Sequence, residues 1–302
     1  MKITGTFLDE ISHDIPSANW GPQQWEKDFD AMKYIGIDTV IVIRAGYRNK
    51  VTFNSKAIAK ETNGILPVPL DLIDLFLEQA ERCGMSLFFG TYDSGNYWMN
   101  GNYQKEIDIN KAFADEVIAK YGHRKALKGW YLCHEIDAYN ESAIKVYKQL
   151  VCHLKQLKDM PSLISPYIHG KKQFSDDAFT LDKHTCQWEN VFQMLDGLID
   201  IVAFQDGNVD FNELPSYIAE NLRLAQKYDF SSWSNVETFS RDMPINFLPI
   251  GWPELLSKMS AANIPGIEKL ITFEFSHFMS PNSIYRSAGN LYERYVDWLT
   301  HG

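Results

Sequence analysis

Two glutamates, Glu135 and Glu237, each stand at the end of a short apolar segment. Glu135 ends residues 129–135 (GWYLCHE), and Glu237 ends residues 232–237 (SWSNVE). Hydrolysis of a glycosidic bond needs two such carboxyl groups, one to protonate the leaving oxygen and one to attack the anomeric carbon or activate water. Burial beneath aromatic residues would raise the pKa of one carboxyl group and keep it protonated as the acid. The pair predicts glycosidase chemistry, provided that the fold places both groups at one cleft.

The elements that would position these glutamates alternate along the whole chain. Apolar, β-rich segments predict strands at residues 2–9, 39–44, 86–92, 129–135, 162–167, 199–205, 232–237 and 270–274. Segments with the apolar spacing of a helix face predict helices at residues 23–35, 70–83, 109–121, 141–157, 185–195, 215–228, 253–262 and 283–299. Eight successive strand-and-helix units of similar length predict one (β/α)8 barrel domain over residues 1–302.

An open, doubly wound sheet is the main structural alternative. That fold usually carries a glycine-rich phosphate turn after its first strand. Residues 9–14 at this position read DEISHD, and neither G-x-G-x-x-G nor a P-loop occurs in the sequence. The closed barrel is therefore the favoured prediction.

Active sites of such barrels form at the C-terminal ends of the strands, and these positions are strongly polar in this sequence. Besides the two glutamates, the residues expected to line the site there are Asp9, Glu10, Arg44, Tyr92, His134, Tyr167, Gln205, Asp206 and Glu274. Trp98 joins them from the polar and aromatic segment 93–103, which has the composition of a substrate-binding loop. Glu274 is expected to bind a sugar hydroxyl, to orient a catalytic group or to act itself. An ordinary strand-exit charge, or an ion pair with a residue such as Arg44, is the alternative for each acidic residue.

The sequence resembles a known group of barrels. Glutamates at the ends of the fourth and seventh strands are similar to those of the retaining (β/α)8 glycoside hydrolases. Residues 5–10 (GTFLDE), 19–21 (NWG) and 36–44 (GIDTVIVIR) resemble the glycosidase-like barrels of domain-of-unknown-function family 4434. The resemblance implies that Glu135 is the acid/base, that Glu237 is the nucleophile and that the substrate is a carbohydrate. His134 departs from the pattern, because the superfamily usually has a sugar-contacting Asn at that position.

The amino-acid composition limits the classes of molecule that this chain is expected to bind. Lys and Arg number 29 against 39 Asp and Glu, which gives a net charge of −10 and argues against general nucleic-acid binding. The four cysteines form no C-x-x-C pair, so we expect neither a zinc site nor a disulfide framework. No apolar run approaches the ~18 residues of a membrane span, and no leader is evident. We therefore expect a cytoplasmic protein without a cofactor or a bound metal.

Two other functions are also compatible with the sequence. The His134 departure is compatible with a carbohydrate-binding barrel that has lost catalysis. A divalent-metal isomerase or lyase would use Glu135, His169, Asp206 and Glu237 as ligands, since carboxylates and imidazole suit Mg²⁺ or Mn²⁺. The segment beginning His134-Glu135 does not complete an H-E-x-x-H motif, because Ala138 stands where the second His is required.

Overall fold

Eight parallel strands close into a barrel in the computed structural model, which describes residues 1–241 and 247–301. In barrel order along the chain they are β1 (Ile3–Leu8), β2 (Thr39–Val42), β5 (Ser86–Gly90), β7 (Leu127–Tyr131), β8 (Ser162–Ile164), β9 (Ile201–Gln205), β10 (Ser231–Asn235) and β13 (Lys269–Thr272). The barrel closes where β1 pairs with β13, with Gly5 opposite Ile271. The predicted (β/α)8 barrel is confirmed, and each predicted strand overlaps one of these eight.

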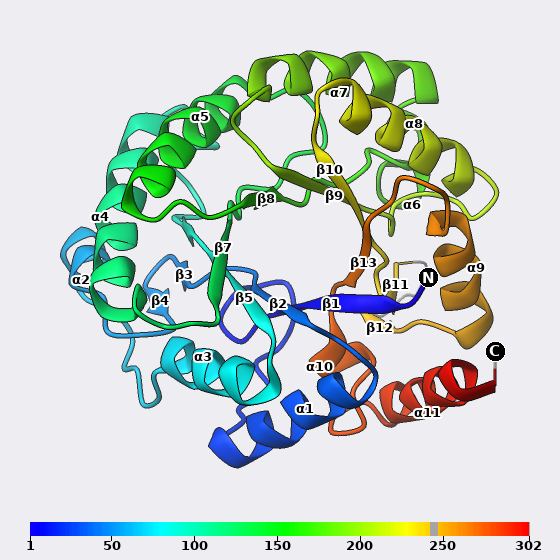
Figure 1. Cartoon of the computed structure of the whole chain (residues 1–302). Helices are drawn as coiled ribbons and strands as arrows, with labels where there is room; N and C mark the ends of the chain where they lie inside the picture. The colour runs from blue at the N-terminus through cyan, green and yellow to red at the C-terminus, as the bar shows by residue number, and fades with distance from the viewer. Residues whose placement is uncertain (242–246, 302) are drawn as a thin grey trace.

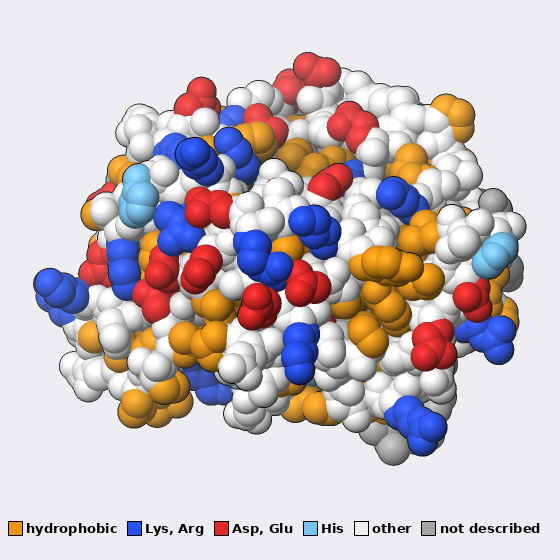
Figure 2. Space-filling view, turned by 60° about the horizontal axis from the view of Figure 1, so that its bottom comes forward, with side chains coloured by type: hydrophobic (Ala, Val, Ile, Leu, Met, Phe, Trp, Pro, Cys, Tyr) orange, Lys and Arg blue, Asp and Glu red, His pale blue; other side chains and the backbone are white. Residues whose placement is uncertain are grey.

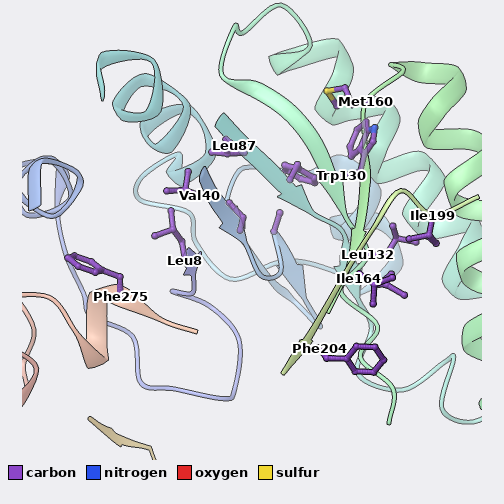
Figure 3. Close-up of a cluster of buried hydrophobic side chains, with 14 of the residues drawn as sticks. Leu8, Val40, Leu87, Trp130, Leu132, Met160, Ile164, Ile199, Phe204 and Phe275 are labelled. Carbon is purple, nitrogen blue, oxygen red and sulfur yellow. The ribbon is translucent and has the colours of Figure 1, made fainter. Parts of the chain in front are cut away.

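Strands such as β1, β2 and β9 are mainly apolar on both faces because they are covered from both sides. Successive side chains of a strand point to opposite faces. In β2, Val40 and Val42 belong to the core between strands and helices, whereas Ile41 belongs to a second core inside the barrel. Figure 3 shows part of the outer core, with Val40, Leu87 and Trp130 among its side chains. This double burial explains why these strands read as continuous apolar runs.

Helices surround the barrel, as Figure 1 shows. The eight helices expected from the sequence are α1 (Pro22–Tyr34), α3 (Leu72–Cys83), α4 (Tyr103–Tyr121), α5 (Glu141–Leu157), α7 (Leu181–Leu195), α8 (Leu214–Lys227), α9 (Trp252–Ala262) and α11 (Arg286–His301). Their ends differ most at α4, which begins at Tyr103 rather than at residue 109. The first turn of α4 is polar and carries a buried Glu106, so the apolar period did not reveal it.

Short elements between the strands and these helices complete the fold. They are β3 (Gly46–Tyr47), β4 (Lys50–Val51), α2 (Lys56–Glu61), β6 (Tyr92–Asp93), α6 (Lys171–Phe174), a 3-10 helix (Ser175–Asp177), β11 (Phe239–Ser240), β12 (Leu248–Pro249) and α10 (Phe275–Phe278). Strands β4, β3 and β6 form a small sheet beyond the ends of β2 and β5. This small sheet holds the segments that follow β2 and β5, and both segments reach the candidate site.

The surface carries both signs of charge. Acidic and basic side chains intermingle with apolar ones over the face that Figure 2 shows. Among the described residues, no helix combines the length and the apolar character needed to cross a membrane.

Candidate active site

A cavity of about 490 Å³ opens at the C-terminal ends of the strands. Six of the residues expected from the sequence line it: Arg44, Trp98, Glu135, Tyr167, Gln205 and Glu237. The two glutamates follow the fourth and seventh strands of the barrel, β7 and β10. The structure therefore brings both carboxyl groups to one cavity, as the strand-end rule predicts.

Glu237 lies two residues beyond β10, and its carboxylate is held on both oxygens. Arg241 Nη2 donates to Oε1 at 2.9 Å, and Arg241 Nε donates to Oε2 at 3.2 Å. Gly207 packs so closely against this carboxylate that a methyl group on its Cα would overlap Oε2. Two neighbours thus fix the direction in which the Glu237 carboxylate points.

Asp206 and Lys258 hold the backbone beneath Glu237. The Glu237 N–H donates to Asp206 Oδ1 at 3.0 Å, and Lys258 Nζ donates both to Asp206 Oδ1 at 2.7 Å and to the Glu237 carbonyl at 3.0 Å. Burial raises the pKa of Asp206, while Lys258 opposes that shift. Asp206 was expected to line the sugar site, but its carboxylate is buried in this ion pair. Its contribution is to position Glu237.

Glu135 has a different environment. Its side chain is half-buried, and Oε1 accepts a hydrogen bond from the Tyr131 hydroxyl at 2.9 Å. Burial raises the pKa of Glu135, although the nearby Arg44 guanidinium acts in the opposite direction. A raised pKa favours the protonated form, which is the form that a general acid requires.

Arg44 follows β2 and anchors one wall of the cavity. Its Nη1 donates to Asp14 Oδ2 at 2.6 Å, and its Nε lies 3.4 Å from Asp93 Oδ2. Asp93 Oδ1 also accepts the indole N–H of Trp98 at 3.1 Å, which fixes Trp98 in the segment expected to bind substrate. Two carboxylates thus compensate the charge of the buried arginine.

Several residues that line the cavity were not expected from the sequence. The most informative are Asp14, Arg48 and Arg241, which stand in loops, and Gln173 of the short helix α6. Apolar lining comes mainly from Phe7, Phe239, Phe247 and Phe273. Arg241 follows Glu237 by four residues across the short strand β11, so no helical period marked it. No sequence signal marked Arg48 or Gln173.

The other six expected residues do not line the cavity. They are Asp9, Glu10, Tyr92, His134, Asp206 and Glu274. His134 was expected to contact the sugar, but its ring is fully buried, with Nε2 3.0 Å from Glu106 Oε1 and an edge-on contact with Trp98. Its neighbour Glu135 reaches the cavity from the other side of the extended backbone. His134 therefore supports the wall behind Trp98.

Three of these residues shape loops at the mouth of the barrel. Asp9 accepts the Ser12 N–H at 3.0 Å, and Glu10 accepts the N–H groups of Ala18 and Asn19, each at 3.0 Å. The Tyr92 hydroxyl donates to the carbonyl of residue 48 at 3.0 Å. These bonds order the loop after β1 and the turn between β3 and β4.

Glu274 caps the short helix α10 and does not face the cavity. It accepts the N–H groups of Ser276 and His277 at 2.7 and 2.8 Å, and it forms an ion pair with the His277 ring. His277 Nε2 lies 2.8 Å from the Pro16 carbonyl. Burial would lower the pKa of His277, but Glu274 and Pro16 raise it to about 9. The charged ring thereby ties α10 to the loop after β1.

The pH dependence of stability follows from this ion pair. Because the pKa of His277 rises from 6.5 to about 9 on folding, its contribution is complete below pH 6.5 and is lost as the pH rises through 9. The free energy of unfolding should fall by about 3 kcal/mol between pH 6.5 and pH 9 in denaturant titrations. The His277→Gln variant should lack this fall. An equal fall in that variant would contradict the assignment.

A second prediction concerns Gly207. The Gly207→Ala methyl group would displace the Glu237 carboxylate, so kcat on any hydrolysed glycoside should fall at least about 100-fold, with a stability cost of about 1–3 kcal/mol. Gly289→Ala in α11 is the matched control, because its methyl group meets only ordinary contacts at 3.7 Å and beyond. Unchanged kcat in Gly207→Ala would show that this packing does not position Glu237.

Among the described residues, one group has donor atoms close enough to suggest a metal site. The donor atoms of Asp93, Glu106 and His134 lie within 4.8 Å of one another. The carboxylates already accept N–H groups, however, because Asp93 Oδ1 binds the Gly95 N–H at 2.7 Å and Glu106 Oε1 binds the Ser94 N–H at 3.0 Å. N–H groups directed at these oxygens repel a cation, so the cluster fits a hydrogen-bond network better than a metal centre.

The ligand set considered for a metal isomerase is not assembled in the described chain. His169 Nδ1 contacts Asp137 Oδ2 at 2.5 Å, and its ring is stacked against Phe174 and Phe179. Asp206 is paired with Lys258, as described above. The geometry therefore does not favour that alternative.

The described chain is thus a (β/α)8 barrel with one carboxyl group at the end of its fourth strand and another at the end of its seventh. It belongs to the family described as domain of unknown function DUF4434, whose sequence pattern matches residues 3–285. A crystal structure from Bacteroides thetaiotaomicron, described as that of a candidate alpha-L-fucosidase, is 44% identical with a TM-score of 0.95. That match covers 100% of this chain and 96% of the other.

More distant structures share the fold. An endo-1,4-beta-D-mannanase from Thermotoga petrophila is 10% identical with a TM-score of 0.58, and the match covers 84% of this chain and 85% of that one. A glycoside hydrolase of family 5 from Bacteroides vulgatus is 11% identical with a TM-score of 0.55, over 85% of this chain and 56% of that one. No protein with a curated description matches the sequence.

Proposed function

We propose that this chain, as one barrel domain, is a glycoside hydrolase that cleaves an O-glycosidic bond with retention of anomeric configuration. The observation that carries the proposal is the placement of Glu135 and Glu237 on one cavity, at the ends of the fourth and seventh strands. Their surroundings differ in the way the two roles require. Burial raises the pKa of Glu135, whereas Arg241 binds and orients the Glu237 carboxylate.

In the first step, Glu237 attacks the anomeric carbon while Glu135 transfers its proton to the glycosidic oxygen. The bond between that carbon and the leaving oxygen breaks, and a glycosyl ester forms on Glu237. In the second step, Glu135 removes a proton from water, and the water oxygen attacks the same carbon and releases Glu237. Arg44 and the Tyr131 hydroxyl stabilise the Glu135 carboxylate between the two proton transfers.

The cavity walls suit a carbohydrate. The rings of Trp98 and Tyr167 line the cavity, and the C–H surface of a sugar can pack against such aromatic rings. Gln205 and Asn235 add amide groups that can bind hydroxyls. This mixture of apolar faces with a few polar groups is typical of small-molecule sites.

The proposal is tested with a panel of 4-nitrophenyl glycosides in both anomeric forms. The panel includes the α-L-fucoside, because the 44% identical relative is described as a candidate for that activity. We expect one sugar to be hydrolysed by the wild type, and neither Glu135→Gln nor Glu237→Gln to hydrolyse it at a comparable rate. Hydrolysis that survives both substitutions would contradict the proposal.

A non-catalytic carbohydrate-binding barrel is the second candidate. It is favoured by one observation, since Arg241 occupies both oxygens of the group that must attack the sugar. Sugar binding without turnover, unchanged in Glu237→Gln, would support this candidate. Turnover abolished by the same substitution would exclude it.

A further inference from the structure

Three arginines line the cavity, and two of them are paired with carboxylates. Arg44 meets Asp14 at 2.6 Å and Asp93 at 3.4 Å, and Arg241 binds the carboxylate of the proposed nucleophile. Arg48 has no carboxylate partner within 4.0 Å among residues 1–241 and 247–301. It is therefore the one arginine of the described cavity wall whose charge is left for a ligand.

Arg48 is exposed at the rim of the cavity, and the loops around it hold its backbone. Its N–H donates to the Asp93 carbonyl at 3.0 Å, and its carbonyl accepts the Tyr92 hydroxyl at 3.0 Å. Its guanidinium lies over the Tyr47 ring, 5.1 Å from the centroid, and close to Gly95, where a Cβ would lie 2.9 Å from Nε. An arginine placed in this way loses less conformational entropy on binding than a free surface side chain does.

Arg48 lines both the main cavity and a second hollow of about 310 Å³. Besides Arg48, the hollow is lined by Asn49, Glu61, Thr62, Tyr92, Ser94, Asn96 and Tyr97. Its single carboxylate, Glu61, is paired with Lys105 at 2.5 Å and accepts a hydrogen bond from the Tyr97 hydroxyl at 2.8 Å. Arg48 is the one described residue common to the two linings, so a ligand bound in either would meet its side chain.

We infer that Arg48 binds an anionic group, a carboxylate or a sulfate ester, on the glycoside substrate. The inference rests on the proposed function and names the substrate class of the same cavity. A guanidinium presents parallel N–H donors that match two oxygens of a carboxylate or sulfate. Because its charge is uncompensated, Arg48 distinguishes an acidic sugar from the corresponding neutral sugar.

The test compares matched 4-nitrophenyl glycosides that differ only at C6. For the gluco, galacto and manno series in both anomeric forms, kcat/KM is measured for the hexoside, the uronoside and the 6-sulfated hexoside. We expect an acidic member of one series to be preferred at least about 10-fold, since a charged hydrogen bond contributes about 1.5–3 kcal/mol. The preferred member separates carboxylate from sulfate as the source of the charge.

Substitutions of Arg48 test whether this residue causes the preference for an acidic glycoside. Arg48→Gln should abolish the preference, mainly through KM, and Arg48→Lys should retain part of it. Arg286→Gln removes the same charge from an exposed position at the start of α11 and should change nothing. Preference for the neutral hexoside, or an equal loss on acidic and neutral substrates in Arg48→Gln, would overturn the inference.

A binding measurement keeps the two proposals apart. Calorimetric titration of the same proteins with glucuronate, galacturonate and the 6-sulfates of glucose and galactose, against the neutral sugars, requires no turnover. Binding of an acidic sugar that disappears in Arg48→Gln supports the inference even if the hydrolase proposal fails. If no acidic sugar is preferred and no affinity depends on Arg48, the inference is wrong, whether or not the protein hydrolyses neutral glycosides.

Discussion

Glu237→Gln should reduce kcat by about 10⁴-fold or more on the glycoside that the wild type hydrolyses fastest. The substitution keeps the shape of the side chain and leaves an amide oxygen for Arg241, but an amide cannot form the glycosyl ester. Initial rates over a range of substrate concentrations would separate kcat from KM. Since binding contacts are preserved, KM should change far less than kcat.

Controls for Glu237→Gln distinguish chemistry from folding. Glu26→Gln removes an exposed carboxylate on α1 and should leave both kcat and stability unchanged. Thermal unfolding of Glu237→Gln should remain cooperative with a Tm lowered by several degrees, because the amide keeps the volume of the side chain but offers Arg241 one acceptor in place of two. If this variant is folded and retains more than a tenth of wild-type kcat, Glu237 is not the nucleophile.

Glu135→Gln should show a loss that depends on the leaving group. A substrate with a poor leaving group needs protonation in the transition state, so its kcat/KM should fall by about 10²–10⁴-fold. A substrate with an activated nitrophenol should lose much less in kcat/KM, because that leaving group departs without a proton. Equal losses across leaving groups would argue against Glu135 as the acid.

The pH profile provides an independent reading of the same residue. Burial raises the pKa of Glu135, and catalysis requires its protonated form. The kcat/KM of the wild type should therefore fall as the pH rises through the pKa of Glu135. This alkaline limb should disappear in Glu135→Gln, whose amide does not titrate.

The barrel and the central pair were predictable because both follow from local sequence. Strands such as β2, with Val40, Ile41 and Val42, are covered on both faces and therefore read as apolar runs. Once eight runs are found, the strand-end rule points to the residues after them. This rule alone predicts that Glu135, Glu237 and Arg44 line the cavity.

The rule does not tell which way a residue beyond a strand will point. His134 and Glu135 are neighbours in the sequence. The His134 ring is nevertheless buried against Glu106, whereas the Glu135 side chain faces the cavity. Asp206 is taken by Lys258 of α9, a pairing between distant segments that no local pattern reveals. Side chains placed by such long-range contacts could not be read from spacing.

Loop residues were the hardest to anticipate. Arg48 and Asp14 reach the cavity because the small β4–β3–β6 sheet and the hydrogen bonds of the β1 loop set the course of the backbone. Loop paths depend on these few contacts and leave no period in the sequence. The proposed recognition of an acidic group by Arg48 could therefore be inferred only from the structure.

The central claim is that Glu237 forms a covalent glycosyl intermediate across the cavity from Glu135. The most direct measurement is mass spectrometry of the protein after reaction with the 2-deoxy-2-fluoroglycosyl fluoride of the sugar it hydrolyses, followed by peptide mapping. We predict a mass increase of one sugar, located on Glu237 and absent in Glu237→Gln. An adduct on another carboxylate, or a hydrolysed reagent without any adduct, would contradict the claim.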